Sequence, residues 1–513
     1  MAPVTVTDNN FQIQISKRAG TLLGLAKHLS QCHSSKKLMT RPLMGALLSE
    51  STQVEEFLDA CGAGRNCRWC AFRSLTAAIK HFSDLSYELL HIRHTLPGYR
   101  LLPIERDFVE ATDETLEFTV EVLQGVAKRL LVKADNLGLV VPSRSLREES
   151  YTEELPVGQL PRDCATRRVE AVSESAARLT TAFLNLAVES KYVRAASGAK
   201  PKEYVSYAAD SLSEEKLRSL ELQFHNLQSL YDTYVSGSEA EQLDTDLPVL
   251  RGHISVVFHL LRTATLFAHH YERHVNKRLC DSQSRQKPVV EAELLLDMLM
   301  KYSVTHINLY IGCAEHLCHE MLKRYAEVVE IEVPVPPYRG FHVRPSTLVS
   351  KIALHYGSEL QMELDDEVYD AGSPLELFRA NEKINANKRR WLSAEIVRLN
   401  LVQEGWGQKD TNVVVRDVVL ALAARSKLLL YEQPLQLPAE SARKEGTLLE
   451  KVIDEMARLL AMGQIDADTK LTAKFIGDRR VLDDIELLAE SGYGEDKFGN
   501  NVRLPEELAY LRR

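Results

Sequence analysis

The chain has 513 residues, of which 45% are hydrophobic and 26% are charged, as is ordinary for a soluble globular protein. Its formal net charge of −9 argues against nucleic acid as the main partner, because binding a phosphate backbone needs a basic surface. At about 100–200 residues per domain, this length predicts roughly three domains.

The sequence favours a cytoplasmic protein. No apolar run reaches the roughly 18 residues of a membrane span, so we expect no membrane partner. The first residues, MAPVTVTDNN, lack the basic and apolar regions of a secretory signal. Eight cysteines are too sparse for a disulfide scaffold, which is consistent with reduced thiols.

Several segments before residue 326 repeat apolar side chains at helical spacing, which is typical of amphipathic or buried helices. We therefore predict that residues 1–325 form an all-α helical bundle. Polar or proline-containing stretches at 141–163 and 236–248 are candidate breaks between two subdomains. The predicted helices are Asp107–Asn136, Val169–Tyr192, Leu217–Tyr234, His253–His274 and Ala292–Val328.

Cys61, Cys67 and Cys70 are the candidate metal ligands of this helical region. Thiolates at this spacing can hold zinc or part of an iron–sulfur cluster. The usual two-pair spacing is absent, however, and Cys67 and Cys70 open a predicted helix. We therefore favour buried or incidental thiols and expect neither a metal nor another cofactor.

His269, His270 and His274 form a second group of potential ligands on a predicted helix. His270 and His274 are four residues apart and share one face, a spacing that can bind a metal. The glutamate of the zincin motif does not follow the first histidine. A solvated or hydrogen-bonded helix face is the favoured interpretation.

The pattern changes at residues 328–335, where apolar and charged residues alternate as in a β-strand. After Gly340 and His342, apolar residues from Leu348 to Tyr356 recur on one side of a predicted helix. Gly357 provides a C-terminal stop for it. His342 therefore lies at or beside the N-cap.

At this position, a phosphoryl group on the His342 imidazole would be stabilised by the start of the helix. The free N–H groups of the first helical turn, which contains Pro345, Ser346 and Thr347, point toward this position, and the helix dipole favours negative charge there. The guanidinium of Arg344 can bind phosphate oxygens with two hydrogen bonds. Since a neutral imidazole is a nucleophile near pH 7, the pattern allows a phosphohistidine at His342 without any metal.

The same run resembles the active-site motif of HPr, the histidine-containing phosphocarrier of the bacterial phosphotransferase system. The resemblance continues through a strand at 358–364, a turn at Asp365–Asp366, a strand at 367–370 and a helix opened by Ser373. This order matches the first part of the HPr open-faced β-sandwich, an α+β fold. It implies that His342 accepts phosphate and that Arg344 stabilises it.

The resemblance also has departures. Ser373 falls near the regulatory phosphoserine of some family members, but an N-cap followed by proline is the simpler interpretation. Residues 385–404 are helix-like where the family has a strand. Either the domain has an insertion here or its final part is remodelled, with Asp417–Leu430 supplying the last helix and Leu430–Leu435 the last strand. The predicted domains are thus 1–325, an HPr-like domain at 326–438 and a small helical C-terminal region at 439–513.

Two functions follow from this organisation. In the first, the chain is a phosphocarrier or phosphorylation-dependent regulator that receives phosphate from an Enzyme I-like donor and passes it to an unidentified acceptor or regulated protein. In the second, the HPr-like domain and the helical region form a non-catalytic scaffold that binds partners. The helical region also offers surfaces for a homo-oligomer.

Overall fold

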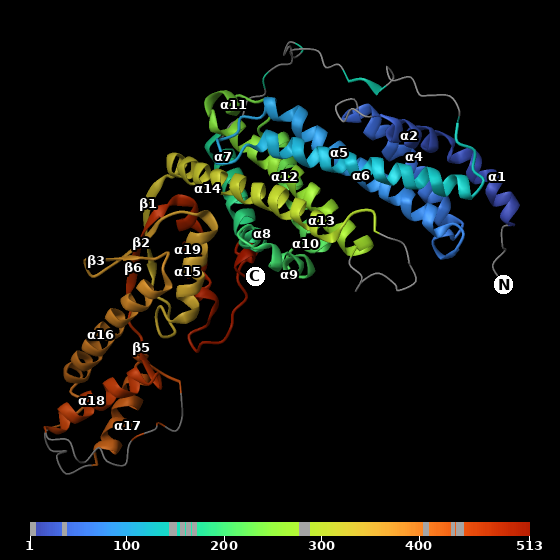
Figure 1. The fold of residues 1–513 in the computed structure, drawn as a ribbon. Coiled ribbons are helices and arrows are strands. Elements are labelled where there is room, and N and C mark those ends of the chain that lie inside the picture. Colours follow the sequence, from blue (N-terminus) through green and yellow to red (C-terminus); the bar gives the residue numbers. More distant parts are fainter. Residues whose placement is uncertain are drawn as a thin grey trace. The chain divides into compact units, whose positions relative to one another are not determined.

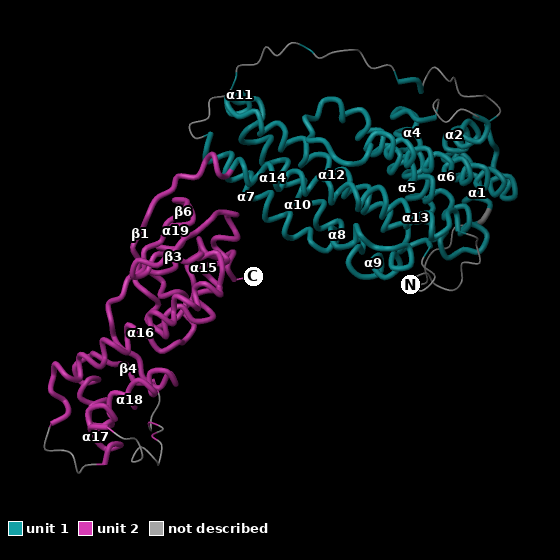
Figure 2. The backbone as a smooth tube through the Cα atoms, turned by 60° about the vertical axis from the view of Figure 1, so that its left-hand side comes forward, with its two compact units in different colours: residues 1–321 teal, residues 322–513 magenta. Residues whose placement is uncertain are grey.

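The computed structural model describes residues 7–32, 38–142, 151–153, 172–275, 288–403, 410–431 and 446–512, with the single residues 160, 166, 435 and 437. The chain divides into two compact units, Met1–Met321 and Leu322–Arg513, which Figure 2 distinguishes by colour. None of the helices in these ranges combines the length and apolar composition needed to span a bilayer.

The first unit is helical, and no β-strand occurs in its described residues. This confirms the predicted all-α character of the region (Figure 1). Shorter helices are α8 (Lys191–Ala196), α9 (Tyr204–Ala209), α11 (Ala240–Leu243) and α13 (Ala292–Met298). The longer helices are α1 (Asp8–Arg18), α2 (Gly20–Gln31), α4 (Arg41–Ala60), α5 (Cys70–Thr95), α6 (Phe108–Asn136), α7 (Val172–Glu189), α10 (Glu214–Tyr234), α12 (Asp246–His270) and α14 (Thr305–Tyr325).

Local sequence explains where these helices begin and which faces they bury. In α6, the side chain of Asp107 accepts a hydrogen bond from the N–H of Glu110 at 3.0 Å, which caps the first turn. The apolar face of α6, including Leu116, Leu123 and Leu130, is fully buried. Helix α6 packs on α2 and α5, and α12 packs on α10 and α5.

The polar stretch at 236–248 is not a subdomain break. It contains α11 and the first turn of α12, and its Ala240 and Leu247 side chains are fully buried. The expected linker is thus anchored in the helical core by Ala240 and Leu247, whereas its Leu243 is 72% exposed. The other candidate break, at 141–163, lies mostly outside the described residues.

The second unit is built on a four-stranded antiparallel sheet in the order β1-β6-β2-β3. Its strands are β1 (Val328–Pro334), β2 (Leu360–Leu364), β3 (Glu367–Asp370) and β6 (Thr472–Asp478). Phe475 of β6 lies opposite Ile331 of β1 on one side and Met362 of β2 on the other. A strand from near the end of the chain therefore joins β1 to the rest of the sheet.

One face of the sheet is covered and the other is open. Helices α15 (Val343–Tyr356), α16 (Pro374–Arg398) and α19 (Arg479–Glu490) contribute Val349, Leu377 and Ile485 to the core beneath the sheet. On the opposite face, Lys474 pairs with Glu330 at 2.7 Å. Alternation along the strands thus separates an apolar face from a charged face, as expected for an open antiparallel sheet.

A separate segment is inserted between α16 and β6. It contains α17 (Thr411–Ala423), β4 (Leu428–Leu430), α18 (Leu448–Ala461) and β5 (Ile465–Ala467). Strands β4 and β5 form their own two-stranded sheet. The apolar faces of α17 and α18 meet the end of α16, at Leu392 and Ile396, in a second core cluster.

This arrangement corrects two expectations about the second unit. The last strand of the main sheet is β6, whereas we expected it at Leu430–Leu435, and its last helix is α19 rather than Asp417–Leu430. The expected boundary between residues 438 and 439 falls inside the second unit. Residues 439–513 are also not purely helical, because β5 and β6 belong to them.

Candidate functional site

His342 occupies the N-cap of α15 in an extended conformation, and its side chain makes no capping hydrogen bond. The chain reaches it through Arg339 and Gly340, whose φ angles are 54° and 63°. A Cβ on Gly340 would lie only 2.2 Å from Oδ1 of Asn381, so glycine is required by both conformation and space. The predicted Gly340–His342 turn at a helix start is therefore present.

The imidazole of His342 is held by residues from two other segments. Its Nε2 lies 2.8 Å from Oε2 of Glu495, a residue 153 positions further along the chain. The ring of Tyr338 meets it edge to face, at 5.4 Å between centroids. The His342 side chain is 24% exposed, and that of Glu495 is 9% exposed. The imidazole is thus oriented by the protein yet still reachable from solvent.

Arg344 lies beside His342 but already has partners within the chain. Its Nη1 donates a hydrogen bond to Oδ1 of Asn501. Its Nε lies 3.8 Å from Oε1 of Glu495. A phosphate held by this guanidinium would therefore exchange these contacts for its own.

The predicted donors Pro345, Ser346 and Thr347 offer no free N–H group to the site, because proline has none and the N–H of Ser346 donates to the carbonyl of His342 at 3.1 Å. The Ser346 hydroxyl is buried and donates to the carbonyl of Phe341 at 2.9 Å. The Thr347 hydroxyl donates to the carbonyl of Val343 at 2.6 Å. Pro345 has no N–H, so the first-turn donors that helix geometry leaves without an intrahelical partner are those of Val343 and Arg344.

No pattern in the sequence points to Glu495. It lies in a loop that follows α19 and a short 3₁₀ turn at Gly492–Gly494. The Glu495 side chain reaches His342 because β6 and α19 return the chain to the same end of the sheet as α15. A single carboxylate in a charged loop cannot be assigned to a distant histidine from sequence alone.

The inserted segment also contacts the approach to His342. The N–H of Arg339 donates to Oδ2 of Asp466 at 3.2 Å, and its Nη2 donates to the carbonyl of Gly463 at 3.0 Å. Tyr431 packs against Tyr338 at 5.1 Å between ring centroids. Residues before and within β5 thereby support the loop that positions the imidazole.

Ser373 lies at the N-cap of α16, with Pro374 directly after it. Its carbonyl accepts the N–H of Leu377 at 3.3 Å, and its hydroxyl makes no capping hydrogen bond. Ser373 is half-buried. It has the predicted N-cap position, and its backbone hydrogen bonds are to Asp370 and Leu377 rather than to the His342 site.

The candidate metal ligands do not come together. Cys61 and Cys67 are exposed, Cys70 is half-buried, and all three are free thiols. Among the described residues, no group of three or more histidine, cysteine, aspartate or glutamate side chains is arranged to hold a metal ion.

The three histidines of this predicted group differ in burial, because His270 is buried whereas His269 and His274 are half-buried. The rings of His269 and His270 stack on His81 at 5.3 and 5.1 Å between centroids. Burial lowers the pKa of His81 to about 3 and that of His274 to about 4. The favoured solvated or hydrogen-bonded face is therefore wrong for His270, which is 1% exposed, has no hydrogen-bond partner among the described residues and is a neutral core residue.

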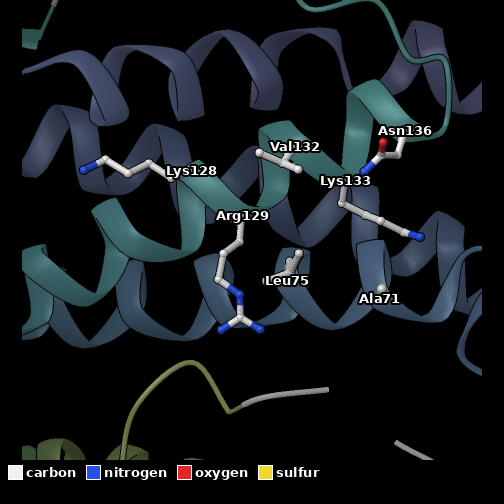
Figure 3. A pocket seen from close by; sticks show the side chains of 7 residues that line it. All are labelled: Ala71, Leu75, Lys128, Arg129, Val132, Lys133 and Asn136. Carbon is white, nitrogen blue, oxygen red and sulfur yellow. The ribbon is translucent and has the colours of Figure 1, made fainter. Parts of the chain in front are cut away.

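A shallow groove of about 460 Å³ lies between α5 and α6 of the first unit (Figure 3). Leu75 and Val132 form apolar parts of its lining, and Lys128, Arg129 and Lys133 add positive charge. It is lined by neither histidine, cysteine nor carboxylate. The groove therefore lacks the nucleophile and the acid–base groups that the surroundings of His342 provide.

The His342 site combines a half-buried imidazole that solvent can reach, a guanidinium, free N–H groups at a helix start and a fixed carboxylate. Such a set suits nucleophilic attack on an electrophile that bears negative charge. No protein-family model, curated protein or solved structure matches the chain. Its function must therefore be argued from this site itself.

Proposed function

We propose that the chain is an HPr-like phosphocarrier or phosphorylation-dependent regulator that accepts phosphate on His342. The observation behind this proposal is the position of His342 at the N-cap of α15, with its imidazole free of any capping role and Arg344 two residues later. Phosphate on this ring would meet the free N–H groups of the first turn, the positive end of the helix dipole and a guanidinium.

The topology of the second unit supports the same proposal. In the sequence, the last helix and the last strand stood in the opposite order to that of HPr, whereas β6 followed by α19 supplies a strand and then a helix. The second unit differs from the HPr pattern in the segment that is inserted before β6. An α+β sheet with one open face and helices α15, α16 and α19 on the other agrees with the expected open-faced sandwich.

In the proposed reaction, a lone pair of the His342 imidazole attacks the phosphorus of a donor phosphohistidine. The new N–P bond forms as the donor's N–P bond breaks, and the electron pair returns to the donor's ring nitrogen. Catalysis rests on positioning and charge stabilisation, since this transfer needs little other chemistry from the protein. The added charge of about −1.5 to −2 can then change contacts with a regulated protein.

The test is phosphate transfer to the full chain. The protein is incubated with an Enzyme I and labelled phosphoenolpyruvate, beside His342→Ala and the control His355→Ala. His355 lies in the last turn of the same helix, away from the N-cap. We expect acid-labile label on the wild type and on His355→Ala, and none on His342→Ala. Label that persists in His342→Ala would refute the proposal.

A second candidate function is a non-catalytic interaction protein. It is favoured by the contacts of Glu495 with Nε2 of His342 and of Asn501 with Arg344, because the chain's own groups engage part of the site. In this case a partner would bind the site or the helical unit without chemistry. Absence of label from the wild type with both Enzyme I and a small chemical donor such as phosphoramidate would favour this function.

A further inference from the structure

Glu495 is placed to govern which nitrogen of His342 reacts. Its Oε2 lies 2.8 Å from Nε2, a normal hydrogen-bond distance, and the carboxylate is 9% exposed. Among the described residues, no hydrogen bond to Nδ1 of His342 is found. The two ring nitrogens therefore have different surroundings.

The loop that presents Glu495 is held by its own hydrogen bonds. Oδ1 of Asp496 accepts the N–H groups of Phe498 at 2.8 Å and Asn500 at 2.9 Å. The N–H of Val502 donates to the carbonyl of Gly494 at 2.9 Å, closing the loop at its base. Gly494 has a φ of 74°, which glycine adopts without strain. The carboxylate is thus positioned by contacts that do not depend on His342.

The chemistry of a carboxylate then selects the tautomer of the imidazole. An ionised carboxylate can only accept hydrogen bonds, so Nε2 must carry the proton and donate it to Glu495. In a neutral imidazole with Nε2 protonated, Nδ1 bears the lone pair. The guanidinium of Arg344, 3.8 Å from the other carboxylate oxygen, places a fixed positive charge beside the carboxylate.

We propose that Glu495 is a positioning residue that directs the phosphoryl group to Nδ1 of His342, an inference that rests on the proposed function. Nδ1 attacks phosphorus, the N–P bond to the donor breaks, and its electron pair leaves with the donor nitrogen. The proton remains on Nε2, where Glu495 stabilises the positive charge that the ring acquires when both nitrogens are substituted. The role is that of the carboxylate that orients a catalytic histidine in hydrolase triads.

The first experiment measures the tautomer without phosphate. In the full chain labelled with ¹⁵N-histidine, the ring signals of His342 are assigned by their loss in His342→Ala. We expect the Nε2-protonated tautomer in the wild type and in the control Glu490→Gln, an exposed residue at the end of α19. Glu495→Gln can donate as well as accept, so its histidine should populate both tautomers. An Nδ1-protonated ring in the wild type would overturn the inference.

The second experiment uses phosphoramidate, which needs no partner protein. Phosphorylation rate and isomer are measured by ³¹P NMR on the wild type, Glu495→Gln, Glu495→Ala, Glu495→Asp and Glu490→Gln. We expect phosphate on Nδ1 in the wild type and in Glu490→Gln. Glu495→Ala should react about 10–100-fold more slowly and give both isomers, and Glu495→Asp should recover part of the rate.

The outcomes separate this inference from the function on which it rests. A purely structural role for Glu495 would leave the ratio of the two phosphohistidine isomers unchanged. Wild-type rate and wholly Nδ1 product in Glu495→Gln and Glu495→Ala would overturn the inference and leave the phosphocarrier function standing. A wild type that takes no phosphate from any donor would overturn the proposed function, and the assignment of Nδ1 would fall with it.

Discussion

At the scale of single residues, Arg344 provides the most direct test of charge stabilisation at the site. We expect Arg344→Ala to slow phosphorylation of His342 about 100-fold, because a preorganised donor to the phosphoryl oxygens is removed. Arg344→Lys retains the charge but not the two-pronged hydrogen bonding, so its loss should be smaller, about 10-fold. The initial rate of label incorporation from phosphoramidate measures both effects.

The matched control for this prediction is Arg379→Ala. Arg379 is a largely exposed arginine of α16 that pairs with Glu376 at 3.6 Å. Its removal should leave the rate within about 2-fold of the wild type, since an exposed pair of this kind contributes little. Equal rates for Arg344→Ala and Arg379→Ala would show that Arg344 has no part in the chemistry.

The buried histidines of the first unit predict that its stability depends on pH. Burial lowers the pKa of His81 to about 3 and that of His274 to about 4, below the ordinary value of about 6.5. Between these values the unfolded chain binds more protons than the folded one. This stability is therefore complete above about pH 6.5 and is lost as the pH falls, by about 1.4 kcal/mol per pH unit for each histidine.

Urea denaturation at about pH 7 and about pH 5 tests this prediction. A Trp391→Phe/Trp406→Phe background leaves Trp69, a buried residue of the first unit, as the one remaining tryptophan of the three. The variant His81→Leu should show a weaker pH dependence of the free energy of unfolding. The control His225→Leu, at an exposed histidine, should not. Equal free energies of unfolding at the two pH values would contradict the assignment of neutral buried imidazoles.

At the scale of elements, Lys388 and Asp466 join α16 to the inserted segment. Lys388 Nζ lies 2.8 and 2.9 Å from the two carboxylate oxygens, and both side chains are 4% exposed. We expect Lys388→Met to destabilise the second unit by about 3–5 kcal/mol, because it leaves a buried carboxylate without its counter-charge. Asp466 also accepts the N–H of Arg339, so the loop before His342 should loosen as well.

The double variant Lys388→Met/Asp466→Asn distinguishes charge from shape. It removes both charges and keeps an acceptor for the Arg339 N–H, so it should be more stable than Lys388→Met alone. Thermal unfolding followed by circular dichroism gives the comparison, with Lys351→Met as the control for loss of a lysine on α15. A double variant no more stable than the single one would mean that the pair is not the source of the effect.

The elements that could be predicted from sequence are those defined by nearby residues. The N-cap at His342 follows from Gly340, and the stop of α15 follows from Gly357, whose φ is 60°. The Asp365–Asp366 turn, with φ angles of 49° and 64°, connects β2 and β3 as expected. In each case, the conformational preference or the apolar–polar alternation of a few neighbouring residues is sufficient to predict the element.

The elements that could not be predicted depend on pairing across long stretches of chain. Residues 428–430 form strand β4, and nothing local indicates that they pair with β5 instead of joining the main sheet. Strand β6 follows an insertion of about seventy residues after α16. Glu495 depends on both β6 and α19 for its position, so the site could be predicted at His342 and Arg344 but not at its carboxylate.

At the scale of the whole molecule, the second unit has a hydrophobic core and an inserted cluster that lie entirely within residues 322–513. We expect the fragment 322–513 to unfold in one cooperative transition and to accept phosphate from phosphoramidate. Its core, including Phe341, Met362 and Phe475, buries enough apolar area to support a domain of this size.

The fragment 322–471 ends one residue before β6 and should not fold. Strand β1 pairs only with β6 in the main sheet, so its backbone N–H and C=O groups would lose their partners. Phe475 and the inward face of α19, including Leu482 and Ile485, would be missing from the core. Adding the peptide 472–513 should restore folding, because it supplies both the central strand and the loop with Glu495. Cooperative unfolding of 322–471 by itself would show that β6 is not the strand that closes this sheet.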